Sequence, residues 1–435
     1  MNILIENCLV LPMTAGAGEA QYFRATVGIA EGRIRMIDRD GSRTESFCRQ
    51  WGADMQVIDG QGKLLMPGLI NVHTHVAMTL MRGFADDLPL MPWLNDKIWP
   101  FEAKIDRDDV ALGARLGIAE MLLSGTTTFV DMYWYEEAVA EIARETGIRA
   151  VLSPCFVDSR MEAFEKDLPA TLERAAGCDR LTVRVAPHAP YSCSKENILR
   201  GVELCHRYGI GMHTHLAETQ AEMEQVRKLH GLSPIRYFDQ LGVFDLPTIA
   251  AHCVWVDDDD IAILRDKGVS AAHNPQSNMK LSSGVSPVER LLQNGVNVGI
   301  GTDGTSSNND LDMWEEMRSC AFLQKLADND PCTLPAYEVL KMATVNGAKA
   351  IGMEGELGVV EEGAIADVIL IDIEKTHFYP RHNLVANLLY CGKAADVDTV
   401  IVDGRILVAD GKIVGVDLPA LYAAMEKRVA EILCR

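Results

Sequence analysis

The sequence has 435 residues, 48% of them hydrophobic, which is enough apolar material for a large core and more than one domain. Its 62 acidic and 41 basic side chains give a formal net charge of −21, which disfavours nucleic acid and anionic membrane surfaces as partners. The 11 cysteines form no CxxC pair, the N-terminus lacks the basic region of a signal peptide, and no apolar stretch approaches the length of a membrane span, so we expect a soluble cytoplasmic protein.

The first predicted elements are two strands joined by a turn in residues 27–37, "VGIAEGRIRMI". The same pattern recurs near the other end of the chain in residues 400–416, "VIVDGRILVADGKIVGV". In both segments an acidic residue precedes the glycine of each turn, as in tight hairpins. Similar hairpins at opposite ends pair naturally, so we predict a small β-sandwich domain built from residues 1–65 and 357–435, with a terminal helix.

The middle of the chain, residues 66–356, has a different pattern, in which short apolar strands alternate with segments of helical period. Eight strands in about 290 residues is the number expected of a (β/α)8 barrel, so we predict a distorted TIM barrel. An open doubly wound sheet is the alternative, although no GxGxxG motif follows the first strand. The predicted strands are 69–72, 126–131, 148–153, 181–187, 210–214, 248–251, 269–272 and 297–302.

Histidines gather at the carboxyl ends of these strands. Active sites of TIM barrels lie at that face, so the placement is informative. Six of the 11 histidines occur there, and the last strand ends in an aspartate. In chain order these residues are His73, His75, His188, His215, His252, His273 and Asp303.

Four of these side chains form a candidate metal site: His73, His75, His215 and Asp303. His73 and His75 are two residues apart on one strand, so they point to the same side. Three imidazoles and a carboxylate suit one divalent ion, for which we predict Zn²⁺, with Fe²⁺ or Mn²⁺ as alternatives. His213 shares strand parity with His215 and is the rival ligand. No lysine follows the fourth strand to bridge a second ion, so we expect a single metal.

Glu218 lies three residues beyond His215 and is a candidate proton shuttle. The plainer explanation is an acidic residue in the first turn of a helix, where the helix dipole favours negative charge.

The motifs "HTH", "HLAET", "AHC" and "GTDG" resemble those of the amidohydrolase superfamily. The resemblance runs over nearly the whole chain. More selective stretches resemble the 5′-methylthioadenosine/S-adenosylhomocysteine deaminase family: "TLMRGFADDLPLMPWLNDKIWPFEAK" (79–104), "APHAPYS" (186–192), "HNPQSNMKLSSG" (273–284) and "GTDGTSSNNDLDMW" (301–314).

This resemblance implies roles for residues of the site. Glu218 would contact the purine and protonate ring N1, while His252 and Asp303 would orient the attacking water, with Asp303 also at the substrate. The residue matching Glu102 holds the ribose hydroxyls in the family, and the residue matching His188 contacts the nucleoside. A carboxylate suits a vicinal diol because it can accept two hydrogen bonds.

Two further residues concern the rest of the substrate. Trp93 resembles an aromatic residue of a lid near the base, although core packing explains it equally well. Some family members carry two arginines after the third strand that pair with the carboxylate of S-adenosylhomocysteine. Here Pro154 stands in place of the first, and Arg160 matches the second across a gap. This departure favours a smaller 5′ substituent such as methylthio, and Arg160 is equally explained as a solvated loop residue.

The resemblance therefore implies a metal-dependent hydrolytic deaminase that converts the 6-aminopurine of an adenosine-type nucleoside to the inosine-type product and ammonia. Candidate substrates are 5′-methylthioadenosine, S-adenosylhomocysteine, 5′-deoxyadenosine and adenosine. Within the superfamily, a guanine deaminase or a triazine hydrolase is the alternative. A catalytically inactive barrel with a role in protein interaction is a third reading. The sequence leaves the 5′ group and the oligomeric state open, and a homo-oligomer is compatible with it.

Overall fold

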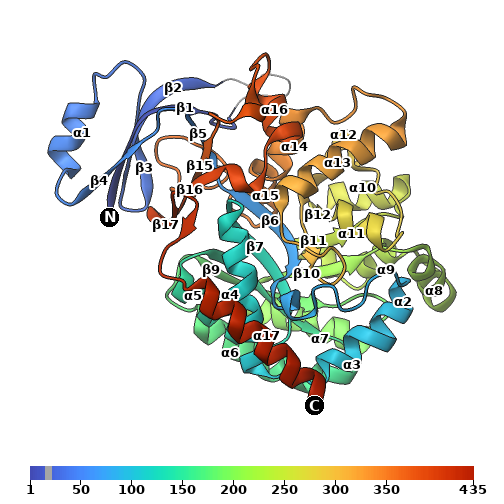
Figure 1. The fold of residues 1–435 in the computed structure, drawn as a ribbon. Helices are drawn as coiled ribbons and strands as arrows, with labels where there is room; N and C mark the ends of the chain where they lie inside the picture. The colour runs from blue at the N-terminus through green and yellow to red at the C-terminus, as the bar shows by residue number, and fades with distance from the viewer. Residues whose placement is uncertain (15–21) are drawn as a thin grey trace.

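A computed structural model describes residues 1–14 and 22–435 and contains two nine-stranded sheets with helices around them (Figure 1). One sheet is formed by the middle of the chain and the other by strands from both chain ends. Residues 15–21 of the predicted segment 1–65 lie outside the described residues.

The middle sheet is a closed parallel barrel. Its strand order follows the chain from β6 to β13, and the two-residue strand β14 pairs in parallel with β6 through Asp303 and Thr74. Because only two residues separate β13 from β14, this pairing joins the last strand to the first. The predicted (β/α)8 barrel is confirmed, and the open sheet is excluded. The strands are β6 (Leu69–His75), β7 (Thr126–Tyr133), β8 (Arg149–Phe156), β9 (Leu181–Pro187), β10 (Gly211–Leu216), β11 (Thr248–His252), β12 (Ser270–His273), β13 (Asn297–Ile300) and β14 (Asp303–Gly304).

Helices connect the barrel strands, except between β13 and β14, and cover the outside of the ring (Figure 1). Several begin at a side-chain cap, as in α4, where Asp106 accepts hydrogen bonds from the first-turn amides of Asp108 and Asp109. These helices are α4 (Arg107–Leu123), α5 (Glu136–Thr146), α6 (Met161–Ala175), α7 (Lys195–Tyr208), α8 (Gln220–His230), α9 (Pro234–Gln240), α10 (Asp258–Asp266), α11 (Pro275–Lys280), α12 (Val288–Gln293), α13 (Met313–Asp328), α14 (Ala336–Met342) and α15 (Val345–Ala350).

A longer connection lies between β6 and α4, at the carboxyl end of the barrel. It consists of η1 (Val76–Met81), α2 (Leu90–Trp93), η2 (Leu94–Ile98) and α3 (Trp99–Glu102). Helix α4 packs tightly on η1 because two of its residues are glycines. A Cβ atom at Gly113 would lie 2.5 Å from the carbonyl oxygen of Ala77, and one at Gly117 would lie 2.7 Å from Val76. This close contact fixes the backbone directly after His75.

The second sheet combines strands from both ends of the chain. Strand β5 pairs in parallel with β1 on one side and antiparallel with β15 on the other, so Leu65 lies opposite both Val10 and Leu370. The predicted hairpins are confirmed, and their turn residues have positive φ angles, as type I′ turns require. The strands are β1 (Asn2–Val10), β2 (Phe23–Ala30), β3 (Arg33–Asp38), β4 (Met55–Asp59), β5 (Lys63–Pro67), β15 (Val368–Asp372), β16 (Val397–Val402), β17 (Arg405–Ala409) and β18 (Lys412–Ile413). The domain boundaries at 65/66 and 356/357 stay a prediction.

Three helices accompany the end sheet: α1 (Thr44–Trp51), α16 (Leu384–Cys391) and the terminal α17 (Leu418–Cys434). Helix α17 extends away from the end sheet and lies along the barrel (Figure 1). Arg428 and Arg435 reach the fully buried carboxylate of Asp109 on α4, at 3.1 Å and 2.6 Å. The C-terminus is therefore anchored on the barrel. No helix in the described part of the chain is long and apolar enough to cross a bilayer.

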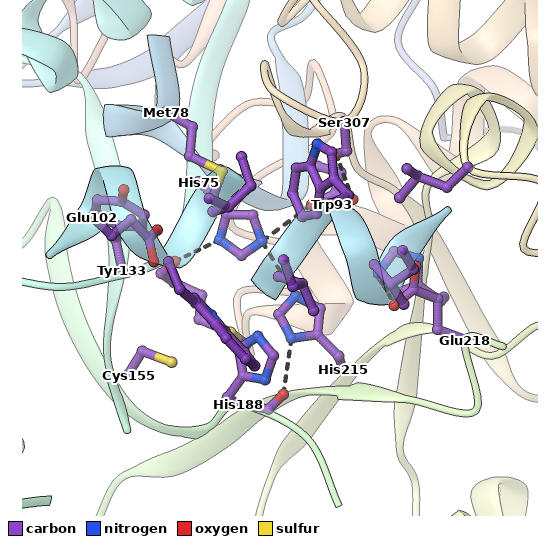
Figure 2. Close-up of a pocket in the computed structure, with 18 of the residues that line it drawn as sticks. His75, Met78, Trp93, Glu102, Tyr133, Cys155, His188, His215, Glu218 and Ser307 are labelled. Carbon is purple, nitrogen blue, oxygen red and sulfur yellow. Dashed lines mark hydrogen bonds and ion pairs between the residues drawn. The ribbon is translucent and has the colours of Figure 1, made fainter. Parts of the chain in front are cut away.

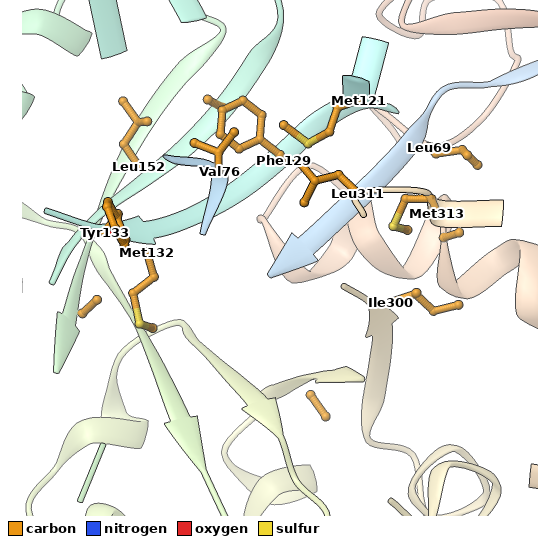
Figure 3. Close-up of a cluster of buried hydrophobic side chains, with 14 of the residues drawn as sticks. Leu69, Val76, Met121, Phe129, Met132, Tyr133, Leu152, Ile300, Leu311 and Met313 are labelled. Carbon is orange, nitrogen blue, oxygen red and sulfur yellow. The ribbon is translucent and has the colours of Figure 1, made fainter. Parts of the chain in front are cut away.

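The main apolar core lies between the barrel strands and their helices. Figure 3 shows part of it, with Phe129 and Leu152 on neighbouring strands and Met121 on α4. A separate cluster contains Val130 and Val151, the adjacent residues on the opposite face of β7 and β8. The same face carries Met132 and Cys155 into the pocket described below, so this cluster packs the barrel beneath the site.

Candidate metal centre and active site

His73 and His75 lie at the end of β6, where the strand is irregular. The register between β6 and β7 slips by one residue between Asn71 and Thr74, which is a β-bulge. Val72 packs in the apolar cluster beneath the site, whereas the ring of His73 faces the rings of His75 and His215, each 4.9 Å away between centroids. Because of the bulge, the side chain of Val72 packs in the apolar cluster and that of the next residue, His73, lies in the site above it.

The structure brings four of the predicted side chains together at one point. The candidate ligand atoms of His73, His75, His215 and Asp303 all lie within 4.8 Å of one another, and all four residues are buried. Oδ1 of Asp303 lies 3.4 Å from Nε2 of His73 and 3.1 Å from Nε2 of His75. Nε2 of His215 lies 3.2 Å from Nε2 of His75. In the described residues this is the one such cluster.

Hydrogen bonds at the far side of two rings determine which nitrogen faces the centre. Nδ1 of His75 donates to the carbonyl oxygen of Met132 at 2.6 Å, and Nδ1 of His215 donates to that of His188 at 2.8 Å. A carbonyl oxygen only accepts, so both rings carry their proton on Nδ1 and present the lone pair of Nε2 to the centre. Nε2 of His73 is buried with no hydrogen-bond partner among the described residues. Converging imidazole lone pairs beside a carboxylate fit a zinc ion.

Asp303 is held in an unusual conformation at the start of β14. Its φ angle is 58°, in the left-handed region that non-glycine residues seldom adopt. The hydroxyls of Ser277 and Ser307 donate to Oδ2 at 2.6 Å and 3.0 Å, and the amide of Gly304 donates to Oδ1. Burial alone would raise the pKa of Asp303, but the nearby His73 and His75 hold it well below its usual range. The carboxylate is therefore fixed and charged.

Glu218 and His252 lie beside each other at the edge of this cluster. Oε2 of Glu218 is 3.9 Å from Nε2 of His252, and Oε1 accepts a hydrogen bond from the hydroxyl of Ser283 at 3.2 Å. Nδ1 of His252 lies 2.9 Å from Oδ1 of Asn278 and donates to it, which leaves the lone pair of Nε2 facing the site. Burial raises the pKa of Glu218. A carboxyl group with a raised pKa can carry a proton at neutral pH and release it to a base.

A pocket opens above the cluster. Figure 2 shows His75 and His215 at its floor, with Glu102 and Glu218 at opposite ends. Trp93 of α2 lines it from the long connection after β6. Besides His75 and His215, the predicted residues that line the pocket are Asp303, Glu218, His252, His188, Glu102 and Trp93.

His188 contributes both its backbone and its ring. Its carbonyl oxygen accepts from His215, and its ring lies 4.7 Å from the ring of His215 between centroids. Nδ1 of His188 is 2.9 Å from the hydroxyl of Ser192. Burial, with the neighbouring histidines, lowers the pKa of His188 to about 3, so the ring is neutral.

Glu102 and Arg160 lie at the far end of the pocket. Glu102 is buried beside Tyr133 and Trp134, and burial raises its pKa despite these neighbours. The guanidinium of Arg160 lies over the ring of Trp134 at 4.3 Å. Both residues line a second hollow, which shares Glu102, Trp134 and Trp99 with the first. Arg160 is thus near the pocket but not in its floor.

Several residues of the site were not identified from the sequence. Ser277 and Ser307 bind Asp303, and Asn278 binds His252; all three occur in stretches that resemble the deaminase family, so those motifs were the available signal. Tyr133 is the last residue of β7, Trp134 follows it, and both line the pocket. Aromatic residues at the carboxyl end of a barrel strand were a signal of the same kind as the histidines.

Comparisons with known proteins agree with this geometry. The chain is 48% identical to a 5-methylthioadenosine/S-adenosylhomocysteine deaminase of Dictyoglomus thermophilum, over 87% of this chain and 89% of the relative. It is 44% identical to a 5′-deoxyadenosine deaminase of Methanothermobacter thermautotrophicus, over 93% and 96% of the two chains. A crystal structure of an adenosine deaminase from Xanthomonas campestris with bound zinc superposes with a TM-score of 0.93 at 32% identity, covering 100% of this chain and 99% of the other. The profile of the amidohydrolase family matches residues 64–407, and the chain belongs to that family.

Proposed function

We propose that the protein is a zinc-dependent hydrolytic deaminase of adenosine-type nucleosides, which replaces the 6-amino group of the purine by oxygen and releases ammonia. The observation that carries this proposal is one pocket with a metal-binding group in its floor, a buried Glu218 beside it and a buried Glu102 at its other end. The names of the relatives support the same reaction class. The roles assigned below to single residues are part of the proposal.

The chain's own residues supply the proton transfers. Glu218, whose pKa is raised by burial, donates a proton to N1 of the purine, which makes C6 electrophilic. His252 accepts a hydrogen bond from the attacking water through Nε2, and Asp303 takes up the proton that this water loses. That proton passes to the amino group, which leaves as ammonia, and the hydroxyl proton left on C6 returns to Glu218 as the 6-oxo product forms. A zinc ion bound by His73, His75, His215 and Asp303 would supply a Lewis acid that lowers the pKa of a water molecule to about 7.

Glu102 and His188 orient the nucleoside in this proposal. The carboxylate of Glu102 accepts hydrogen bonds from the two ribose hydroxyls, which suits a vicinal diol. The neutral ring of His188, on the floor beside His215, contacts the nucleoside from below. Trp93 covers the base from the opposite side, because it lines the pocket from the connection after β6.

The second hollow supports a small 5′ substituent. It extends from Glu102 past Trp134 to Arg160, so a group on C5′ has room there when the ribose lies at Glu102. Among its lining residues Arg160 is the one cation, and its guanidinium already stacks on Trp134. We therefore propose 5′-methylthioadenosine or 5′-deoxyadenosine as preferred substrates over S-adenosylhomocysteine.

The cellular location and the partners of the protein are proposed from its cysteines and its charge. All 11 cysteines are free, as expected of a reducing compartment, and this supports a cytoplasmic location. The net charge of −21 disfavours binding to nucleic acid. A homo-oligomer is compatible with these features.

An ammonia-release assay tests the function. The purified, zinc-loaded chain is incubated with adenosine, 5′-deoxyadenosine, 5′-methylthioadenosine, S-adenosylhomocysteine, guanine and melamine. Ammonia from the nucleosides, with 5′-methylthioadenosine or 5′-deoxyadenosine highest in kcat/KM, is the expected result. Turnover of guanine or melamine alone contradicts the nucleoside proposal. An inactive scaffold would bind no metal and release no ammonia from any of the six compounds.

A further inference from the structure

His213 is a buried histidine of β10 that lies behind the metal-binding group rather than in it. It is fully inaccessible to solvent and precedes His215 by two residues. Its Nε2 lies 2.8 Å from Nδ1 of His73, and the two rings are perpendicular, with an interplanar angle of 89°. His213 therefore touches the one histidine of the group whose outer nitrogen does not meet a backbone carbonyl.

A contact of 2.8 Å between two ring nitrogens requires one proton between them. Two bare lone pairs would repel each other, and two N–H groups would clash. A neutral imidazole carries a single proton on one of its two nitrogens. The shared proton therefore resides on Nδ1 of His73 or on Nε2 of His213. This choice also determines the protonation of the other two ring nitrogens.

The need for a free lone pair on Nε2 of His73 decides between these arrangements. The hydroxyl oxygen of Ser153 lies 3.2 Å from Nδ1 of His213, and a hydroxyl can accept from this nitrogen or donate to it. His73 can offer the lone pair of Nε2 to a metal ion only when its proton is on Nδ1, and Nε2 of His213, 2.8 Å away, must then be the bare acceptor. The bare Nε2 accepts from Nδ1 of His73, which leaves the lone pair of Nε2 of His73 free. That nitrogen faces Asp303 at 3.4 Å.

We infer that His213 is a positioning residue that fixes the metal-binding tautomer of His73, because its Nε2 accepts the proton on Nδ1 of His73 while Ser153 lies against its other ring nitrogen. His75 and His215 obtain the same tautomer directly from backbone carbonyls. The inference rests on the proposed function, because it takes the four-residue group to hold zinc. It adds a fifth residue on which zinc affinity depends and which does not contact the ion.

Two substitutions at this position separate the hydrogen bond from the packing. His213→Gln places an amide oxygen near the former Nε2 and can still accept from His73, whereas His213→Asn reaches only the former Nδ1 side. Both replace the ring by a smaller amide and leave comparable space. The measurement is the zinc dissociation constant of the purified full chain, obtained by competition with a chromophoric chelator without substrate. Loss of a partner of a metal-bound histidine typically costs 10–100-fold in metal affinity.

We expect His213→Asn to bind zinc about 10–100-fold more weakly than the native chain and His213→Gln to recover most of that loss. Equal loss in both variants, or native affinity in His213→Asn, would overturn the inference. Thermal unfolding of the metal-free variants reports packing separately, and a purely structural role would lower both melting temperatures without separating the two zinc affinities.

The native protein provides a test that requires no substitution. Nitrogen-15 labelling of histidine in the zinc-loaded chain distinguishes protonated from bare ring nitrogens by NMR. We expect His213 to carry its proton on Nδ1, and a proton on Nε2 would overturn the inference. The test is independent of turnover: if the chain binds zinc but deaminates no nucleoside, the proposed function fails while the role of His213 stands.

Discussion

Replacing Glu102 by alanine should damage the turnover of ribonucleosides without damaging the metal site. The carboxylate is 5% exposed and lies at the end of the pocket opposite Glu218. Its hydrogen-bonding neighbours are Tyr133 and Trp134, and Glu102 is not one of the four residues of the metal-binding group in the described structure. The substitution therefore removes the proposed partner of the ribose hydroxyls and leaves the zinc content and the proton donor in place.

The expected size of the effect follows from the burial of the interaction. A buried hydrogen bond to a charged group contributes about 1.5–3 kcal/mol, which corresponds to about a 10- to 150-fold change in kcat/KM. The 2′-hydroxyl is one of the two proposed partners of Glu102. Native enzyme should therefore turn over 2′-deoxyadenosine about 10- to 150-fold less efficiently than adenosine.

The assay is a double-mutant cycle between the side chain and the substrate. Steady-state ammonia release is measured for native and Glu102→Ala enzyme with adenosine and 2′-deoxyadenosine, with zinc content as the control. The variant should lose most of the advantage of adenosine and only a little of its activity on the deoxynucleoside. An equal fall with both substrates would show that Glu102 does not bind the 2′-hydroxyl, and the assignment of the ribose end of the pocket would then be wrong.

Three further outcomes are expected. Glu218→Gln should keep its zinc by elemental analysis but lose about 10²–10⁴ in kcat, because an amide cannot donate the proton to N1; near-native turnover would contradict the role. Arg160→Ala should lower kcat/KM for S-adenosylhomocysteine and spare 5′-methylthioadenosine, which has no carboxylate, and an equal effect on both would place Arg160 outside the substrate site. Asp109→Ala removes the carboxylate that pairs with Arg428 and Arg435 of α17, and it should lower the free energy of unfolding in denaturant by about 1–3 kcal/mol. Glu431→Gln on α17 is the control and should leave that free energy unchanged.

The barrel and its metal-binding group were predictable because both depend on short-range patterns. Apolar runs alternating with helical segments fix the order of the strands, and the fold rule then brings the residues after each strand to one face. His73, His75 and Asp303 are more than 200 residues apart at the extremes, yet strand closure through β6 and β14 makes them neighbours. No knowledge of individual contacts is needed for that step.

The sequence did not predict how far below the metal-binding group each side chain of a strand lies. His213 and His215 share strand parity, and the sequence favoured His215 because it sits at the strand end with Glu218 in reach. The structure places His213 behind the metal-binding group, against Nδ1 of His73. The bulge in β6 also has no clear signal in the sequence, since it depends on how β6 pairs with β7. The hydroxyls of Ser277 and Ser307 depend on the paths of two loops, which local pattern does not determine.

The pairing of the two chain ends has a consequence for the order in which the protein can assemble during translation. One edge of β5 needs β15 as its partner, with Leu65 opposite Leu370, so the ribosome must produce the entire barrel before that edge is covered. At about 5–20 residues per second, this leaves the edge open for roughly 15–60 s. An uncovered apolar edge is a template for pairing with other chains. A nascent chain that stalls after the barrel but before Val368 should therefore aggregate, although its metal-binding residues have all been synthesised.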